Sequence, residues 1–390
     1  YSVGTRRINR IVFVVVVVIV GALTLQTRGG QGEEPRDEAY KERALKTPSF
    51  DGFQLLQLQD FPGQGTALVG LLNAFWESKG VISAEEFSQF NSELVPLIRF
   101  EKAVYENGEL FEATIEIANF YKELDNQTIY WTITDEANNE LKKGTLSEVN
   151  LAIGNNTDLG KIVHNINVES AKKLTITVSV KDTKYKNSWN IWVYPKNVST
   201  TDKNIVFTTS ITTAEKALKN GKKVFLNPDP KSLKGITGRF VPVFWSPVHF
   251  PNQPATMGVL LDEKHPAFKK FPTDSHTNWQ WWDLCINSKS VIVDSIATKP
   301  LVRVIDNFVT NHHLTNLFEA KVGNGQLVFS SIDLHSKLNE RPVARQLKHS
   351  VLEYMKSTDF KPENTISMKD IKSLVEKNKQ TDFSAKDIYK

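Results

Sequence analysis

The densest group of polar and aromatic residues in the chain falls within twenty positions, FPTDSHTNWQWWDLCINSKS at 271–290. Proteins usually hold sugars with aromatic rings that pack on C–H surfaces, beside a few well-placed polar groups. The segment therefore predicts a carbohydrate-binding site. The alternative is that its tryptophans fill a gap between two domains. The candidate binding residues are Asp274, His276, Asn278, Trp279 and Trp282.

Cys285 follows the tryptophans and is the only cysteine, which excludes an intramolecular disulfide and a thiolate metal cluster. A cysteine with a histidine and an acid could be a nucleophile, as in amidotransferases and papain-like enzymes. Here it follows WWDL and lacks the small residues of a strand-to-helix elbow, which favours a buried structural cysteine. The sequence contains no HExxH, P-loop or GxGxxG motif, so it predicts no metal and no cofactor.

A second candidate site lies in GFQLLQLQDFPGQGTALVG, residues 52–70. Its apolar start predicts a short strand, its proline and glycines predict a tight loop, and TALVGLLNAFWESKG predicts a helix. In a β/α barrel such a loop lies on the face that carries the chemistry. Gln59, Asp60 and Gln64 would then contact a ligand. The alternative is an ordinary turn in which Asp60 helps to cap the helix.

The N-terminal residues place a basic segment, RRINR, before fifteen uncharged and mainly apolar residues at 11–25. This order is typical of a signal peptide, and the apolar block is short for a membrane span of about 20 residues. No A-x-A cleavage site follows. A buried strand is a third interpretation, but fifteen residues are too long for one strand. We expect an exported, periplasmic or envelope-associated protein, with membrane association through residues 11–25 as one form of it. Because Tyr1 rather than Met begins the sequence, a longer reading frame is also expected.

Two further segments have distinct patterns. Between 99 and 198, short runs such as FEATIEI (111–117) alternate with period two and are separated by turn signals, which predicts an antiparallel β-sandwich. Trp192 and Tyr194 at its end could stack on a sugar ring or lie in a domain interface.

Residues 199–360 mix strands and helices. NIVFTTS, AEKALKNG and KKVFLNP form a βαβ pattern, which implies a parallel sheet. LFEAKVGNGQLVFSSIDL predicts a hairpin that turns at 323–325, and RPVARQLKHSVLEYMKS predicts a closing helix. The polar, lysine-rich residues 361–390 predict a loosely attached or disordered tail. The net charge of +4 does not indicate a nucleic-acid partner.

Long runs of the sequence resemble the C-terminal part of large family 2 glycoside hydrolases of the β-galactosidase type, which are common in Bacteroidetes. The run from Tyr40 to Phe87, with its QDFPGQGTALVG motif, resembles the end of their catalytic barrel. VPLIRFEKAVYENGELFEATIEIANF is similar to the start of the β-sandwich that follows. The segments with HTNWQWWDL and LVRVIDNF look like their C-terminal domain, which is similar to class I glutamine amidotransferases without their catalytic function.

The resemblance covers about residues 39–360 and implies a multidomain fold. We expect an N-terminal apolar segment and linker (1–38), the last β/α unit of a TIM barrel (39–98), an antiparallel, Ig-like β-sandwich (99–198), an amidotransferase-like α/β domain (199–360) and a tail (361–390).

The resemblance further implies a retaining hydrolase of O-glycosidic bonds, in which one glutamate attacks the anomeric carbon and another protonates the leaving oxygen. In the family both glutamates lie on barrel strands that would precede Tyr40, so no catalytic residue is assigned within this chain. A lone barrel strand cannot close, and we expect the isolated chain to be poorly stable or inactive. The expected partner is carbohydrate, a β-galactoside-like glycan. Two other classes stay open, a non-catalytic carbohydrate-binding protein and an envelope-anchored interaction protein.

Overall fold

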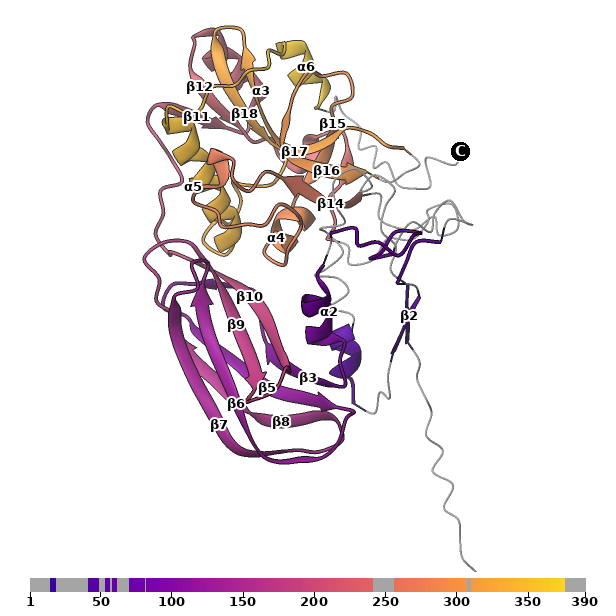
Figure 1. The fold of residues 1–390 in the computed structure, drawn as a ribbon. Coiled ribbons are helices and arrows are strands. Elements are labelled where there is room, and N and C mark those ends of the chain that lie inside the picture. The colour runs from indigo at the N-terminus through magenta and orange to yellow at the C-terminus, as the bar shows by residue number, and fades with distance from the viewer. Residues whose placement is uncertain are drawn as a thin grey trace, which may run out of the picture.

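The computed structural model describes most of the chain after residue 81 and short pieces before it. The described residues are 41–48, 58–61, 70–80, 82–240, 256–306 and 310–375, with the backbone alone at 15–18 and 53–56. Within them the protein is multidomain and rich in β-structure, with several sheets and few helices (Figure 1).

The first sheet joins two segments that are far apart in the sequence. β1 (Val15–Val18) pairs in parallel with β2 (Phe53–Leu56). Four residues of the apolar N-terminal block therefore form a strand. The rest of 1–38 lies outside the described residues. Within the described part of the chain, no helix is long and apolar enough to cross a membrane.

The helix expected in TALVGLLNAFWESKG is wrong for the described part of that run. Leu72 pairs instead with Gln59 in a parallel bridge and with Ser78 in an antiparallel one. The side-chain oxygen of Asn73 accepts the backbone N–H groups two and four residues ahead, at 2.8 and 3.0 Å. Such local bonds close a turn and compete with helix formation. Phe75, which helical spacing placed on the apolar face, is 82% exposed.

Two sheets then form the β-sandwich that the alternating runs predicted. The smaller sheet contains, in order, β3 (Leu94–Phe100), β5 (Leu110–Asn119) and β8 (Gly154–Asn165). The larger contains, in order, β4 (Val104–Glu106), β10 (Lys186–Tyr194), β9 (Lys172–Val180), β6 (Leu124–Asp135) and β7 (Glu140–Leu151). All these pairs are antiparallel except β4 with β10. The inward positions of FEATIEI are at most 1% exposed, which confirms the predicted core face.

Two short helical segments precede the sandwich. Residues 41–45 are helical, and α2 (Ala84–Phe90) begins at Ser83. Ser83 accepts the backbone N–H of Glu86, whose carboxylate accepts the N–H of Ser83 in return. This capping box starts the helix because it satisfies two N–H groups that have no partner within the helix.

A mixed sheet forms the α/β domain. Its strand order is β11 (Ile205–Thr208), β12 (Lys223–Leu226), β18 (Gly325–Ser330), β17 (Leu314–Val322), β15 (Lys289–Ile292) and β13 (Ile236–Thr237). β16 (Pro300–Asp306) pairs with β17 and with β14 (Thr256–Leu261). The helical elements are α3 (Ile211–Lys219), α4 (Trp281–Ile286), α5 (Pro342–Lys356), α6 (Met368–Ser373), and the 3-10 turns η2 (Pro230–Ser232) and η3 (Pro266–Phe268).

Several predicted elements of this domain are confirmed. β11, α3 and β12 form the expected βαβ unit with parallel strands, and β18 continues the parallel order next to β12. β17 and β18 form the predicted hairpin, whose turn contains Gly323 with a φ of 57°. α3 packs with α6 on one face of the sheet, while α5 packs on the other face, in a separate core cluster.

The sandwich and the α/β domain meet through both faces of one strand. In β10, Trp189, Ile191 and Val193 lie in the core of the sandwich. Trp192 and Tyr194 point the other way and lie in the core of the α/β domain, each at most 1% exposed. Because successive side chains of a strand point to opposite faces, β10 contributes side chains to the cores of both domains. Of the two interpretations of these residues, the domain interface is confirmed and stacking on a surface-bound sugar is wrong.

The prediction of a loosely attached tail is wrong for residues 361–375. Ile366, Ile371 and Leu374 are at most 5% exposed and belong to the core on the α3 face. The backbone of this segment also exchanges hydrogen bonds with Lys321 on β17. Three well-spaced apolar side chains anchor the segment despite its lysine-rich composition. Residues 376–390 lie outside the described part of the chain.

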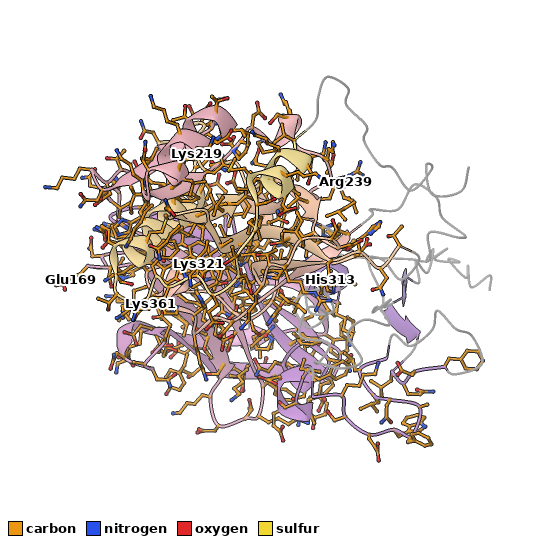
Figure 2. All side chains as sticks on the ribbon, turned by 90° about the horizontal axis from the view of Figure 1, so that it is seen from above. Glu169, Lys219, Arg239, His313, Lys321 and Lys361 are labelled. Carbon is orange, nitrogen blue, oxygen red and sulfur yellow. The ribbon has the colours of Figure 1, made fainter. Side chains whose placement is uncertain are left out.

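Charged side chains are spread over the surface of the molecule. Figure 2 shows Lys219 and Lys361 on one side of the view and Arg239 on the other. The cationic side chains labelled there do not gather into one patch.

Candidate functional site

The loop at Asp60 is held by contacts within the chain. Asp60 is 6% exposed, and its Oδ1 accepts the backbone N–H of Gly70 at 2.8 Å and pairs with Lys79 Nζ at 2.6 Å. Its carboxylate thus links residue 60 to the described residues 70–80, which contain no helix. Residues 62–69, where a helix capped by Asp60 would begin, lie outside the described part of the chain. Gln59 is half-buried beside it, and Gln64 lies outside the described residues. Ligand contact by these three residues stays a prediction.

The polar members of the 271–290 segment lie where the two domains meet. Asp274 Oδ1 pairs with Lys173 on β9 of the sandwich at 2.8 Å, and its Oδ2 accepts Asn278 Nδ2 at the same distance. Burial alone would raise the pKa of Asp274, but Lys173 and these hydrogen bonds outweigh it and lower the pKa. Asn278 is buried, and its Oδ1 has no hydrogen-bond partner among the residues that the structure describes. His276, half-buried, pairs through its backbone with Leu260.

One tryptophan of that segment fills the space inside the domain, and two are exposed as a binding site would require. Trp281 is fully buried, donates its Nε1–H to Thr273 Oγ1 at 3.0 Å, and contacts the Phe271 ring edge-on. Trp279 and Trp282 are 42% and 50% exposed. Both pack against Phe240, with ring centroids 5.3 and 5.2 Å away. We call Phe240, Trp279 and Trp282 the aromatic surface.

Cys285 is a structural cysteine, as the sequence favoured. It lies in α4 and is 8% exposed within the core of the α/β domain. Burial raises the pKa of its thiol to about 12. Because the thiolate is the nucleophilic form, the thiol is unreactive at neutral pH.

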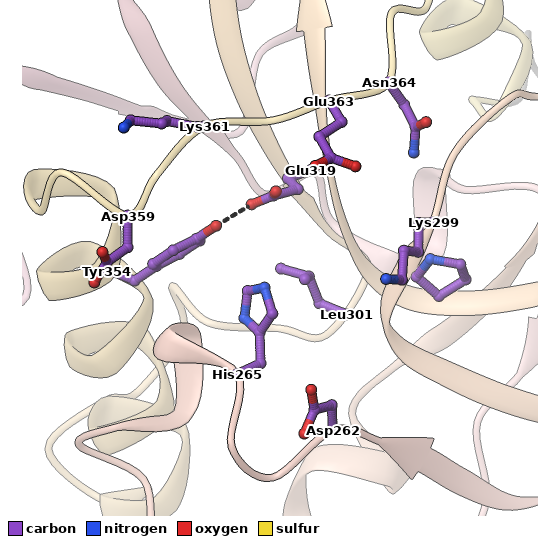
Figure 3. Close-up of a pocket in the computed structure, with 11 residues that line it drawn as sticks. Asp262, His265, Lys299, Leu301, Glu319, Tyr354, Asp359, Lys361, Glu363 and Asn364 are labelled. Atoms are coloured by element: carbon purple, nitrogen blue, oxygen red, sulfur yellow. Dashed lines mark hydrogen bonds between the residues drawn. The ribbon is translucent and has the colours of Figure 1, made fainter.

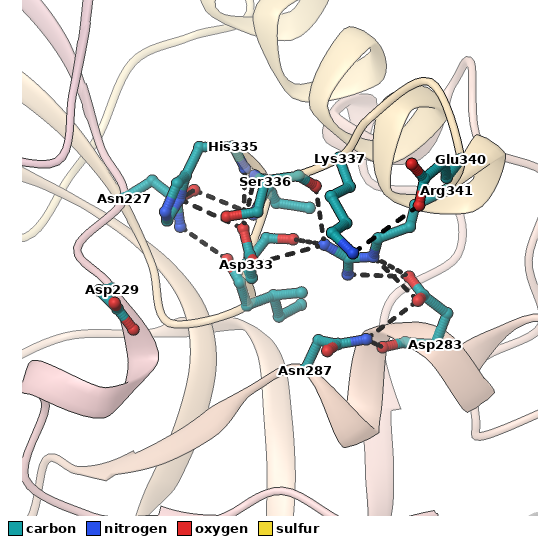
Figure 4. Close-up of polar contacts among 12 residues, drawn as sticks. Asn227, Asp229, Asp283, Asn287, Asp333, His335, Ser336, Lys337, Glu340 and Arg341 are labelled. Carbon is teal, nitrogen blue, oxygen red and sulfur yellow. Dashed lines mark hydrogen bonds and ion pairs between the residues drawn. The ribbon is translucent and has the colours of Figure 1, made fainter.

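A polar cluster that the sequence analysis missed lies beyond the carboxyl ends of β12 and β18 (Figure 4). We call it the carboxyl-end cluster, and it contains Asn227, Asp283, Asp333, His335 and Arg341. Asn227 directly follows β12, and the chain then leads to Leu233 on the α3 face. Asp333 and His335 follow β18, and the chain then leads to α5 on the opposite face. Two adjacent parallel strands whose connections leave on opposite faces form a topological switch point, where open α/β sheets commonly bind ligands.

Asn227 fixes the orientation of His335. The Asn227 side chain is fully buried, and its Nδ2 donates to the carbonyls of Ser330 and Ile332 at 3.0 and 2.6 Å. Its Oδ1 must therefore face the N–H of Leu334 and Nδ1 of His335, each at 3.0 Å. This network places a proton on Nδ1 of His335, which donates to Asn227 Oδ1, so that Nε2 is the ring nitrogen turned away from Asn227.

Arg341 closes the other side of this cluster. Its Nε lies 2.9 and 3.0 Å from the two carboxylate oxygens of Asp283. Its Nη1 donates to the Asp333 carbonyl at 2.9 Å. Burial alone would raise the pKa of Asp333, but the N–H groups of Ser336 and His335 outweigh it and lower the pKa. The cluster thus brings one oriented imidazole ring close to the side chains of Asp333, Arg341 and Asp283.

A sequence signal for this cluster existed. Asn227 follows VFL and Asp333 follows LVFSSI, so each polar residue comes soon after an apolar strand. The carboxyl ends of neighbouring parallel strands meet at one sheet edge. The sequence did not indicate that β12 and β18, which are about 100 residues apart, are neighbours in the sheet, and the cluster could not be predicted without that strand order.

Comparisons with known proteins give two family matches. A domain of unknown function (DUF8488) matches residues 109–195, within the sandwich. A second domain of unknown function (DUF8487) matches residues 205–376, in the α/β domain. No curated protein matches the chain.

Solved structures show only weak likeness. An alkylpurine DNA glycosylase from Pseudomonas fluorescens is 12% identical over 26% of this chain and 31% of its own, with a TM-score of 0.22. The CARDB domain of a Pyrococcus furiosus protein is 15% identical over 26% of this chain and 93% of its own, with a TM-score of 0.21. A β-glucuronidase from Parabacteroides merdae is 12% identical over 35% of this chain and 21% of its own, with a TM-score of 0.21. The chain thus spans less than a third of the glycosylase and of the glucuronidase.

Proposed function

We propose that this chain is a non-catalytic, carbohydrate-binding part of a β-galactosidase-like glycoside hydrolase. The aromatic surface is the observation that carries the proposal. Trp279 and Trp282 present exposed rings a few residues from the amide of Asn278 and the carboxylate of Asp274. Rings that pack on the C–H face of a sugar, with polar groups beside them, are suited to a β-galactoside-like glycan.

The packing within the aromatic surface also supports binding. Phe240 packs against both tryptophans, at interplanar angles of 29° to Trp279 and 51° to Trp282. Rings fixed before a ligand arrives lose little conformational entropy when it binds. Large exposed apolar groups that lie together are typical of a binding surface rather than of plain protein surface.

The glycoside hydrolase context comes from the resemblance of residues 39–360 to family 2 enzymes. The proposal assigns no catalytic residue to this chain, because in that family both glutamates lie on barrel strands upstream of the matching segment. The chain would then bind glycan beside a barrel that supplies the chemistry. The location proposed with this function is the periplasm or envelope, because RRINR precedes the apolar block at 11–25.

The test is glycan binding by the full chain. Titration with β-linked galacto-oligosaccharides, followed by calorimetry and tryptophan fluorescence, is expected to show saturable binding. Trp279→Ala and Trp282→Ala should each weaken the affinity about tenfold, which corresponds to about 1.4 kcal/mol. Trp76→Asn is the matched control, because Trp76 is 63% exposed and has a φ of 66°, a conformation that asparagine tolerates.

Two results would contradict the proposal. One is an affinity that is the same in the wild type and in both tryptophan variants while their melting temperatures are unchanged. The other is hydrolysis of an aryl β-galactoside by the full chain at a normal enzymatic rate, since a non-catalytic part has no such activity.

A further inference from the structure

A cavity of about 270 Å³ lies in the α/β domain and shares no lining residue with the aromatic surface or the carboxyl-end cluster (Figure 3). It is formed where four elements approach one another: η3, the start of β16, the middle of β17, and α5 with the segment that follows it. Its lining residues are Asp262, His265, Lys299, Pro300, Leu301, Glu319, Tyr354, Asp359, Lys361, Glu363 and Asn364.

Glu319 supplies a partly desolvated carboxylate to this cavity. Tyr354 donates its hydroxyl to Glu319 Oε2 at 2.7 Å. Among the described residues this is the one hydrogen bond to the Glu319 side chain. Burial raises the pKa of Glu319, and the nearby charge of Glu363 raises it further. Figure 3 shows these two carboxylates on the same side of the cavity.

His265 supplies a neutral hydrogen-bond donor. Its Nδ1 accepts the backbone N–H of Ala267 at 3.2 Å, which assigns the ring proton to Nε2. Burial lowers the pKa of His265, so the ring is neutral at pH 7. The ring lies edge-on to Tyr354, with centroids 5.2 Å apart. Figure 3 places it between Tyr354 and Leu301, inside the cavity.

Three charged lining groups have unused hydrogen-bonding capacity. Lys299, Lys361 and Glu363 make no hydrogen bond and no ion pair with any residue in the described part of the chain. Leu301 and Tyr354 are 7% and 4% exposed and form an apolar wall. The cavity therefore combines acceptors, donors and a C–H-compatible surface.

We propose that this cavity binds a neutral polyol of monosaccharide size. A hydroxyl group both donates and accepts, so it can pair with the carboxylate of Glu319 and with the N–H of His265. An anion would face the carboxyl groups in the lining, and a cation would face the ammonium groups of Lys299 and Lys361. The lining carboxyl groups are those of Asp262, Glu319, Asp359 and Glu363. The volume lies just below the range of drug-sized pockets, which fits one sugar ring rather than an oligosaccharide. This inference does not depend on the aromatic surface.

The experiment uses the full chain with methyl β-D-galactoside and D-glucose as probes, followed by ligand-observed NMR. Saturable binding with a Kd on the order of 1 mM is expected for at least one of them, a value typical of weak small ligands. Leu301→Trp fills the cavity without removing a polar group, and Glu319→Gln removes the charge but keeps the shape. Each should weaken binding at least tenfold. Glu353→Gln is the matched control, because Glu353 is on the same helix and pairs with Lys356 outside the cavity.

The outcomes separate this proposal from the aromatic surface. Binding that is lost in Trp279→Ala but retained in folded Leu301→Trp and Glu319→Gln overturns the cavity site and leaves the proposed function standing. Binding that is lost in the cavity variants but retained in Trp279→Ala supports the cavity site. D-glucosamine or D-galacturonate binding where the neutral probes do not bind overturns the ligand class. No binding of either neutral probe at concentrations on the order of 100 mM also overturns the proposal.

Discussion

Glu42 joins the segment at 41–48 to the sandwich through a buried carboxylate. It is 5% exposed, and its Oε1 accepts Nδ2 of Asn187 at 2.7 Å and Nε1 of Trp189 at 2.8 Å. Glu42→Ala removes the acceptor of Trp189 Nε1 and leaves Asn187 Nδ2 only its bond to the Pro96 carbonyl. It is expected to lower the free energy of unfolding by about 2–4 kcal/mol. Urea unfolding measures this difference.

The control for that change is Glu42→Gln. The amide keeps an oxygen that can accept from Asn187 and Trp189 but loses the ion pair with Lys46. Glu42→Gln is expected to lower the free energy of unfolding by less than half as much as Glu42→Ala, since a single partly exposed ion pair contributes little. Equal costs for both variants would show that charge rather than hydrogen bonding fixes the segment.

Lys348 on α5 predicts a dependence of stability on pH. Its Nζ lies 3.4 Å from the centroid of the Phe207 ring, and burial lowers its pKa to about 8. In the unfolded chain the pKa is about 10.4. The folded state therefore releases this proton first as the pH rises. Burial of the Lys348 charge therefore lowers the stability in full below pH 8, and this loss shrinks to zero as the pH rises from 8 to about 10.4.

Lys348→Met should consequently be more stable than the wild type at pH 7, by an amount that shrinks as the pH approaches about 10.4. Paired denaturant titrations of the two proteins at each pH cancel the contributions of all other groups. A stability difference that does not change with pH would contradict the assignment. It would also indicate that contact with Phe207 compensates for burial of the charge.

At the scale of elements, α6 makes the C-terminal segment part of the α/β core. Ile371 is fully buried on the α3 face. Ile371→Ala is expected to lower the free energy of unfolding by about 2–4 kcal/mol, because it removes buried methyl groups and leaves a cavity. Lys369→Ala on the exposed side of the same helix should change it by less than about 0.5 kcal/mol. If both variants unfold like the wild type, the segment does not contribute to the core.

Elements with strong periodicity could be predicted from the sequence, while those set by local polar bonds could not. Alternation, helical spacing and glycine turns were enough to predict four parts of the fold. These are the strands of the sandwich, the β11–α3–β12 unit, the β17–β18 hairpin and α5. The helix expected after Gly70 was wrong, because one asparagine side chain bonds to the backbone ahead of it. The sequence analysis did not predict that α6 is packed on the domain. The overall lysine-rich composition of the segment concealed the three apolar residues that anchor it.

The candidate sites differ in the same way. The 271–290 segment was visible because its residues are neighbours in the sequence. The sequence did not indicate which tryptophan would be buried, because that depends on how α4 lies against the domain interface. The cavity and the carboxyl-end cluster draw residues from segments about 100 residues apart, such as His265 with Tyr354 and Asn227 with His335. Only the strand order brings such residues together.

At the scale of the whole molecule, the sandwich and the α/β domain should unfold as one unit. Arg345 on α5 is 7% exposed and pairs with Glu106 on β4, while Tyr194 donates its hydroxyl to Gln280. Arg345→Met leaves Glu106 partly buried without its cation and is expected to lower the free energy of unfolding by about 2–4 kcal/mol. Calorimetry of the wild type should show one transition for both domains.

The double variant Arg345→Met with Glu106→Gln tests the coupling directly. If the two residues act as a pair, the double variant should be more stable than the sum of the single changes predicts, by more than about 0.5 kcal/mol. Additive effects, or two separate calorimetric transitions in the wild type, would show that the domains are joined by the chain but not by this interface.

The two-sided strand β10 has a consequence for ancestry. Trp192 belongs to a strand of the sandwich, but its side chain lies in the core of the α/β domain. Neither domain is therefore complete without the other. Recombination that placed either domain beside a foreign neighbour would expose two aromatic faces to water. The families matched at 109–195 and at 205–376 are therefore expected to be inherited together and in this order. Substitutions at Trp192 should accompany substitutions in the α/β core rather than those in the sandwich.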